Sequence, residues 1–340
     1  MKLLLALVLA FSLSQPLSAA TQVHGAGSSF IAPLFTKWIS EFSKTNPEVQ
    51  INYQSVGSGA GVRQFSQKTV DFGATDAPMT DEQLKEAGKV VHLPVAMGAV
   101  VVTYNVPGLT KPLQLDGATL GEIFLGNVKV WNDPRVAKLN KGANLPAQPI
   151  LIAHRSDGSG TTSIFTEYLS KVSPAWKAKV GTATSVKWPS GLGGKGNEGV
   201  AGLVKQTPGS IGYVEMIYAK SNGLAFASIL NGAGVVVEPT LASVTAAASG
   251  ALKTMPADFR ASLTNAPGKG AYPISGMTWV LIWDRPSDEP KSASLSKFLQ
   301  WTLKEGQPMA EALHYSPLPP SLAKKVLNRL QELEPKKPKA

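Results

Sequence analysis

The sequence predicts an α/β fold with a largely parallel sheet, organised as about two domains. Strand-like segments alternate along the chain with amphipathic helices, which is typical of parallel sheets covered by helices. The length of 340 residues corresponds to two domains at roughly 150 residues each. Hydrophobic residues make up 43% of the chain and charged residues only 16%, so there is enough apolar material for buried cores.

The N-terminal segment has the pattern of a secretory signal peptide. Lys2 precedes an apolar run, Leu3–Leu13, that is too short to span a bilayer, and small residues follow at 18–20 before Thr21. We therefore expect residues 1–20 to be removed and the mature protein to be exported. The chain has no cysteine, which excludes disulfides, thiolate catalysis, cysteine-ligated metals and an acylated-cysteine anchor.

The first third of the mature chain predicts a repeated order of strand, glycine loop and helix. Apolar residues recur at helical spacing in residues 30–42, directly after a Gly/Ser loop. Residues 49–53 alternate like a strand and lead into a second glycine loop. Four further elements follow: a short helix at 62–67, a strand at 70–74, a polar helix at 81–87 and a buried strand at 95–106.

The rest of the chain continues the same alternation with longer connections. A helical section at 120–124 is followed by a Pro/Asn-rich stretch and then a strand at 150–154. A third Gly/Ser loop precedes an amphipathic helix at 164–172. The later predicted elements are strands at 210–214 and 273–283 and closing helices at 294–303 and 322–333.

Three Gly/Ser loops, Gly25–Ser29, Gly57–Gly61 and Gly158–Thr162, each lie between a strand and a helix. The first N–H groups of a helix have no intrahelical partner, and the helix dipole is positive there. Glycine lets an anion approach these groups closely. One such loop is an ordinary capping composition, but three in one chain, with Arg155 beside the third, favour an oxyanion site.

The familiar catalytic and metal-binding motifs are missing from the sequence. Gly194-Lys195 resembles part of a P-loop, but Pro189 stands in place of its first glycine and Gly196 in place of its Ser/Thr. No serine has the glycine spacing of a nucleophile elbow. The four histidines do not form a metal-binding arrangement. We therefore predict no catalysis, no metal and no cofactor.

The net charge of +10 comes from scattered Lys and Arg residues. Without a basic cluster, it does not predict nucleic-acid binding, and we interpret it as a field that steers small anions. No apolar run reaches the length of a transmembrane helix, so we expect no membrane insertion.

Five segments together resemble the periplasmic phosphate-binding proteins (PstS-type) of Pst phosphate ABC importers. They occur in order along most of the mature chain: GAGSSF at 25–30, VDFGATDAP at 70–78, RSDGSGT at 155–161, VKWPSGLGGKGN at 186–197 and SIGYVE at 210–215. The resemblance implies a two-lobed class II periplasmic binding fold with the ligand in the cleft. It places lobe I at 21–104 plus 273–340 and lobe II at 105–272, joined by two hinge strands that cross near Tyr104 and Tyr272.

The resemblance also implies a set of ligand-binding positions, which lie on both lobes. Asp157 is implied as the carboxylate that orients Arg155, and His154 is given no role. The implied phosphate-binding groups are Ser29, the Phe30 backbone N–H, Ser58 and Asp76 from lobe I, and Arg155, Ser159, Gly160 and Thr161 from lobe II.

Asp76 is the unexpected member of this set, because it is an anion in an anion site. Phosphate keeps one or two protons near neutrality, and a carboxylate accepts a hydrogen bond from such an O–H, whereas sulfate has no proton to donate. A helix N-cap is the alternative role for Asp76.

We therefore expect a monomeric protein that binds inorganic phosphate with high affinity and delivers it to a membrane importer of two permease subunits and an ATPase. The alternatives are a binding protein for sulfate or molybdate, and an exported phosphatase-like or adhesive protein.

Overall fold

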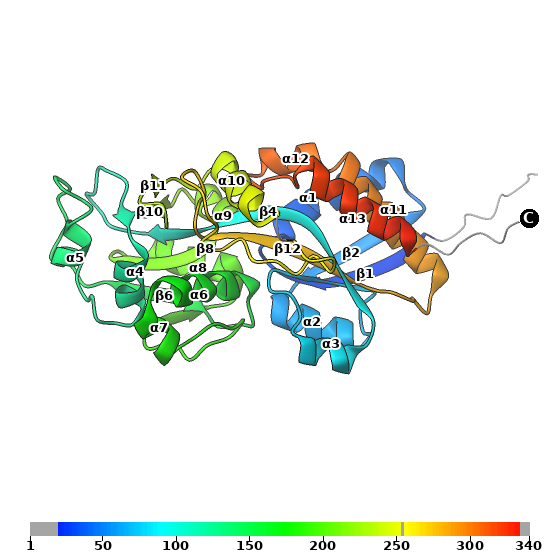
Figure 1. Cartoon of the computed structure of the whole chain (residues 1–340), viewed down its shortest axis with the longest axis horizontal. Helices are drawn as coiled ribbons and strands as arrows, with labels where there is room; N and C mark the ends of the chain where they lie inside the picture. Colours follow the sequence, from blue (N-terminus) through cyan, green and yellow to red (C-terminus); the bar gives the residue numbers. More distant parts are fainter. Residues whose placement is uncertain (1–19, 253–254, 334–340) are drawn as a thin grey trace, which may run out of the picture.

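The computed structural model describes residues 20–252 and 255–333 (Figure 1). The first nineteen residues of the predicted signal peptide and the lysine-rich tail after Leu333 lie outside this part. Figure 1 shows two halves, one drawn mainly in blue and red and the other mainly in green, with two long strands running between them. These strands are β4 (Val90–Tyr104) and β12 (Ser275–Trp283).

The main sheet of the described residues has the order β2-β1-β3-β12-β4-β8-β6-β7, with β9 beside the end of β4. β1 is parallel to β2 and β3, and β6 is parallel to β7 and β8, while β4 and β12 are antiparallel to their neighbours. The bounds are β1 Thr21–Gly27, β2 Val49–Ser55, β3 Phe72–Thr75, β6 Leu151–Arg155, β7 Leu192–Gly194, β8 Ser210–Glu215 and β9 Ala225–Phe226. A smaller sheet joins β11 (Val236–Val237), β10 (Ser228–Leu230) and β5 (Gln114–Leu115).

Strand β4 links the two halves because it changes partner along its length. Its residues up to Ala99 pair with β12, and its residues from Val100 onward pair with β8. At the point of exchange, the Val100 N–H donates to the Ile274 carbonyl at 2.9 Å, and the Tyr272 hydroxyl donates to the Val100 carbonyl at 3.0 Å. The chain thus changes sheet partner between Ala99 and Val100, whereas the crossings near Tyr104 and Tyr272 remain predictions.

Strand β4 also begins earlier than the apolar run predicted, at Val90 instead of Val95, and it passes through Pro94. Proline has no N–H to donate to a neighbouring strand, so a central strand tolerates it only at an irregularity. The register with β12 shifts where Thr278 faces Ala96 and Trp279 faces Pro94, which leaves Val95 as the extra residue of a bulge.

Helices cover both faces of the sheet (Figure 1). The predicted closing helices are present, and the first is longer than its apolar pattern because it begins at Glu289 behind an Asp288 N-cap. The first half, drawn mainly in blue and red, carries α1 (Ala32–Thr45), α2 (Ser58–Ser66), α3 (Asp81–Ala87), α11 (Glu289–Lys304), α12 (Gln307–Ala312) and α13 (Pro320–Glu332). The second half carries α4 (Gly117–Phe124), α5 (Pro134–Ala137), α6 (Gly160–Val172), α7 (Pro174–Lys179), α8 (Gly196–Gln206), α9 (Met216–Ser221) and α10 (Leu241–Ala251).

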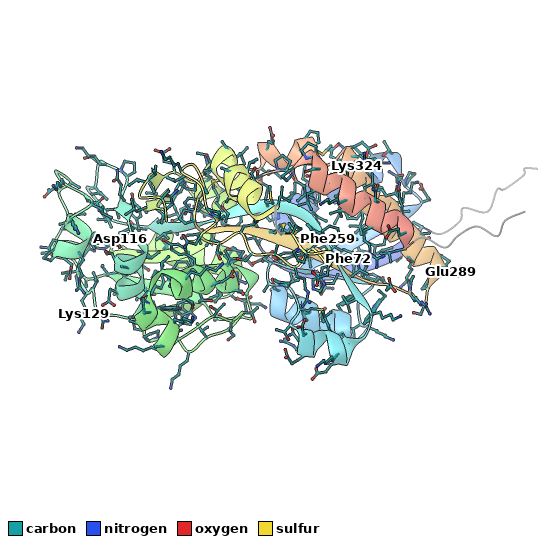
Figure 2. All side chains as sticks on the ribbon, viewed as in Figure 1. Phe72, Asp116, Lys129, Phe259, Glu289 and Lys324 are labelled. Carbon is teal, nitrogen blue, oxygen red and sulfur yellow. The ribbon has the colours of Figure 1, made fainter. Side chains whose placement is uncertain are left out.

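A continuous aromatic and aliphatic core holds these helices on the sheet. In the first half, Phe35 and Phe42 both pack edge-on against Phe298 of α11. In the second half, Phe165 stacks on Tyr213 with ring centroids 4.3 Å apart. Figure 2 shows the charged side chains of Lys129, Glu289 and Lys324 at the periphery, away from the buried Phe72. No helix in the described part is long and apolar enough to cross a membrane.

Candidate functional site

The carboxyl ends of the parallel strands in the two halves face one another. In open α/β sheets, ligands bind in the crevice outside these ends. The loop after β1 carries Ser28 and Ser29, and Asp76 follows β3. From the other half, Arg155 ends β6 and Asn197 follows β7. The Gly59 N–H donates to the Gly158 carbonyl at 2.9 Å, so the two glycine loops are in direct contact.

Asp76 lies at the centre of the first half of the site and is only 3% exposed. The single hydrogen of the Ser28 hydroxyl is shared between the two carboxylate oxygens, which lie 2.7 and 2.6 Å from Ser28 Oγ, and the Thr278 hydroxyl donates at 2.6 Å. The Ser58 hydroxyl lies 3.3 Å from the carboxylate and accepts the Asp76 N–H at 3.2 Å. Burial raises the pKa of Asp76 to about 6, although these hydroxyls and the charge of Arg155 act in the opposite direction.

Arg155 lies at the centre of the second half and is also only 3% exposed. Its Nε donates to one oxygen of Asp157 at 2.7 Å, its Nη2 donates to the other, and its Nη1 lies 3.4 Å from the Thr161 hydroxyl. Asp157 also accepts the Gly196 N–H at 3.1 Å. Burial favours a higher pKa for Asp157, but the guanidinium and the N–H donors outweigh it and lower the pKa.

Helix α6 points its first turn at Asp76. The Ser159 hydroxyl caps the helix by accepting the Thr162 N–H at 3.0 Å, which leaves its own O–H available as a donor. The N–H groups of Gly160 and Thr161 lie in the first turn, where a helix offers no internal acceptor. A Cβ atom on Gly160 would lie 2.5 Å from Asp76 Oδ2, so only glycine allows this close approach.

The loop after β1 is held by three tyrosine hydroxyls, each of which donates to a successive backbone carbonyl. Tyr53 and Tyr218 donate to the carbonyls of Ser28 and Ser29, both at 2.7 Å. Tyr315 donates to the carbonyl of Phe30, whose N–H in turn donates to the Ser28 hydroxyl at 2.9 Å. These contacts fix the direction in which the loop presents its hydroxyls, and Tyr218 comes from the opposite half.

The structure brings all the predicted site residues into one cluster, and all of them except Asp157 are buried. Their assignment as ligands remains a prediction, since the contacts above are contacts within the protein. His154 packs flat on Trp188 with ring centroids 4.9 Å apart. The cluster consists of Ser29, Phe30, Ser58, Asp76, Arg155, Asp157, Ser159, Gly160 and Thr161.

Four residues to which sequence reasoning assigned no role also lie against this cluster: Ser28, Asn197, Glu215 and Thr278. Asn197 lies in the first turn of α8. We did not predict this helix because glycine, which is frequent in residues 194–202, has low helix propensity. The helical spacing of Val200, Ala201 and Val204 was the signal that could have identified it. Thr278 lies in the middle of β12, where no local signal marks it. Glu215 is fully buried, which raises its pKa well above the usual value, and its Oε1 has no hydrogen-bond partner among the described residues.

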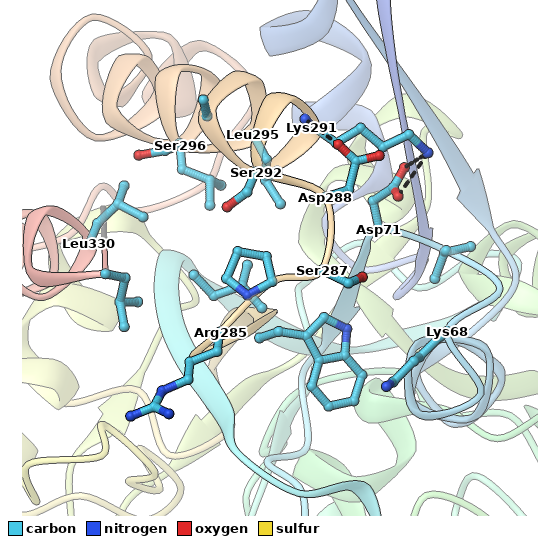
Figure 3. Close-up of a pocket in the computed structure, with 17 residues that line it drawn as sticks. Lys68, Asp71, Arg285, Ser287, Asp288, Lys291, Ser292, Leu295, Ser296 and Leu330 are labelled. Carbon is cyan, nitrogen blue, oxygen red and sulfur yellow. Dashed lines mark hydrogen bonds and ion pairs between the residues drawn. The ribbon is translucent and has the colours of Figure 1, made fainter. Parts of the chain in front are cut away.

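A separate cavity of about 420 Å³ lies at the opposite ends of the strands (Figure 3). It is bounded by Asp71 before β3, Trp283 at the end of β12, Leu295 of α11 and Leu330 of α13. Figure 3 shows the Asp71–Lys291 ion pair at its rim and apolar side chains along its walls. A small oxyanion needs converging donors, so this cavity does not match the chemistry of the Asp76–Arg155 cluster. No group of three or more His, Asp or Glu side chains among the described residues forms a metal site.

Comparison with known sequences identifies related proteins. The family model of the PBP superfamily domain matches residues 14–305. The phosphate-binding protein PstS of Xylella fastidiosa strain Temecula1 is 44% identical over 308 residues, which cover 90% of this chain and 84% of the relative. The phosphate-binding protein PstS of Haemophilus influenzae is 46% identical over 307 residues, which cover 89% of this chain and 91% of the relative.

Comparison with solved structures supports the fold. A crystal structure of a phosphate-binding protein from Stenotrophomonas maltophilia matches with a TM-score of 0.70 at 18% sequence identity. The match covers 91% of this chain and 94% of that chain. It shows that the two proteins share a periplasmic-binding-protein architecture.

Proposed function

The chain belongs to the PBP superfamily and, within it, to the PstS phosphate-binding proteins, and we propose that it binds inorganic phosphate between its two halves for transport by an ABC importer. The observation that carries this proposal is the pairing of a buried acceptor, Asp76, with a buried donor group, Arg155, on facing sides of one cluster. A ligand that fits must have both oxygens that accept and an O–H that donates. Phosphate near neutrality has both.

The proposed ligand groups are those of the predicted set. Arg155 offers its guanidinium to phosphate oxygens, and the hydroxyls of Ser29, Ser58, Ser159 and Thr161 add neutral donors. The N–H groups of Gly160 and Thr161 complete the donor set, together with the Phe30 N–H, which would exchange its contact with the Ser28 hydroxyl for phosphate. Asp157 keeps Arg155 in place through its two-oxygen contact.

We further propose that the protein works as a periplasmic monomer without catalytic activity. The proposed lobes are residues 21–104 plus 273–340 and residues 105–272, and their closure would present the loaded protein to the permease. Strand β4 changes its partner from β12 to β8 between Ala99 and Val100, which supports a hinge near these two residues.

Calorimetry of purified residues 21–340 against phosphate, sulfate and molybdate tests the proposal. In a closed site, sulfate would set an unprotonated oxygen against the Asp76 carboxylate, and such like-charge contacts cost several kcal/mol. We therefore expect phosphate to bind at least about a thousandfold more tightly than sulfate, at about 1.4 kcal/mol per tenfold. Equal or tighter binding of sulfate or molybdate would make this a binding protein for another oxyanion. No heat with any of the three would point to an adhesive or phosphatase-like role.

A further inference from the structure

Asn197 connects the two halves of the molecule at the Asp76–Arg155 cluster from a fully buried position. Its side-chain Nδ2 lies 3.0 Å from the Ser29 hydroxyl of the first half and 3.1 Å from the Thr161 hydroxyl of the second half. Its backbone N–H also points to the Ser29 hydroxyl, at 3.3 Å. One amide thus contacts a hydroxyl on each side of the site.

The orientation of the Asn197 amide follows from its remaining contact. The Glu215 backbone N–H donates to Asn197 Oδ1 at 2.9 Å. A backbone N–H is always a donor, so the atom facing it must be the carbonyl oxygen of the amide. The NH2 group therefore faces Ser29 and Thr161, and each of its two hydrogens has one hydroxyl oxygen as acceptor.

This arrangement determines the direction of the two hydroxyl hydrogens. A hydroxyl has two acceptor lone pairs and one donor hydrogen. The Ser29 oxygen receives both N–H groups of Asn197, and the Thr161 oxygen receives the amide of Asn197 and, at 3.4 Å, Nη1 of Arg155. Both hydroxyl oxygens already accept hydrogen bonds from the protein. Each hydroxyl can therefore contact a ligand as a donor, through its O–H.

The hydroxyls on the Asp76 side have the opposite arrangement. Ser28 and Thr278 use their hydrogens to donate to the Asp76 carboxylate. Among the described residues, neither the Ser29 nor the Thr161 hydroxyl donates to a protein acceptor. The site therefore contains hydroxyls that hold a carboxylate and hydroxyls whose hydrogens remain for an anion.

We propose that Asn197 is a positioning residue that turns the Ser29 and Thr161 hydroxyls into donors for the bound oxyanion and ties the two halves together around it. The inference rests on the proposed function, because it takes phosphate as the anion. Asn197 acts through the two hydroxyls and does not itself contact the ligand.

A double-mutant cycle read by phosphate calorimetry tests this role. We expect Asn197→Ala to weaken phosphate binding about tenfold in the wild-type background, because the hydroxyls lose their orientation. In a Ser29→Ala/Thr161→Val background, the same change should cost threefold or less, since no hydroxyls remain to be oriented. A purely structural role would give equal losses in both backgrounds and would overturn the proposal. Asn140→Ala, which removes a buried amide that contacts Gln114 and Val136, is the matched control and should leave affinity unchanged.

Asn197→Asp provides a second variant in case the alanine variant does not fold, because it keeps an oxygen for the Glu215 N–H. Its carboxylate would accept the hydrogens of both hydroxyls and repel an anion, so we expect phosphate affinity to fall at least a hundredfold. A folded Asn197→Asp protein with wild-type affinity would overturn the proposal. The wild-type titration separates the two hypotheses: no phosphate binding by the wild type refutes the proposed function, whereas wild-type binding without coupling refutes only the role of Asn197.

Discussion

The Asp76 side and the Arg155 side of the cluster hold carboxylates in different environments. Asp76 accepts hydrogen bonds from the neutral hydroxyls of Ser28 and Thr278, and burial raises its pKa to about 6. Asp157 contacts the guanidinium of Arg155 directly, and its pKa lies below the usual value although burial acts against this. Neutral donors hold a carboxylate in place without balancing its charge, whereas a guanidinium does both. We therefore expect the Arg155 side to provide affinity and the Asp76 side to provide selectivity.

Of the variants that compare the two sides, Arg155→Ala should have the largest effect, because it removes the only cation among the described residues of the site and leaves Asp157 as an unpaired carboxylate. Truncating one partner of a buried charge pair costs about 2–5 kcal/mol, so phosphate affinity should fall at least about thirtyfold by calorimetry. Arg135→Ala is a matched control, since Arg135 binds Asp133 through the same two-oxygen contact with its side chain 45% exposed. Wild-type affinity in an Arg155→Ala protein with an unchanged circular dichroism spectrum would remove Arg155 from the site.

Asp76→Asn tests the selectivity of the opposite side. Phosphate should still bind, while sulfate should gain, because the amide carries no charge and can turn its NH2 toward an oxygen. The ratio of phosphate to sulfate affinity should shrink at least tenfold, roughly 1.4 kcal/mol, when both anions are titrated at one pH and salt concentration. An unchanged ratio would mean that Asp76 has only a structural role.

Gly160→Ala tests whether the two sides must approach each other as closely as they do here. The added Cβ would lie 2.5 Å from Asp76 Oδ2 and 2.6 Å from Ser58 Oγ. Overpacking typically costs about 1–3 kcal/mol, so phosphate affinity should fall about tenfold. Gly202→Ala, in helix α8 with nothing within 4 Å of the added atom, should bind phosphate normally. Equal affinities for the two variants would show that the close approach at Gly160 is not needed.

The raised pKa of Asp76 predicts the smallest effect in this series, a pH-dependent change in the free energy of unfolding of the ligand-free protein. The folded protein holds the Asp76 proton more tightly than the unfolded chain, so this contribution is complete below the unfolded pKa of about 3.9 and is lost as the pH rises through about 6. Relative to Asp76→Asn, the wild type should therefore gain about 1 kcal/mol in free energy of unfolding between pH 7.5 and pH 5.5. Urea denaturation of both proteins at the two pH values measures this difference. A constant difference, or one that grows as the pH rises, would contradict a raised pKa.

Local patterns in the sequence predicted the elements that position the site. The helical spacing of Phe35, Trp38 and Phe42 predicted α1, and all three side chains are buried against the sheet. The loop at Gly57–Gly61 was predicted as a connection, but α2 already begins at Ser58, so most of the loop is the first helical turn. Because glycine and serine have low helix propensity, the sequence pattern did not predict this first turn of α2.

Composition, helical and strand periodicity and the Gly/Ser loops are local properties, and they were enough to predict an α/β chain with helix N-termini and an arginine suited to an oxyanion. The partners of Asp76 and Ser29 are not local. Thr278 donates to Asp76 across 202 positions of the chain, and Asn197 reaches Ser29 across 168 positions. Sheet order and register bring these residues together, because β12 lies beside β3 and β7 lies beside β6. Pairing of distant strands depends on packing of the whole core, so only the tertiary structure decided which hydroxyls donate to the carboxylate and which accept from Asn197.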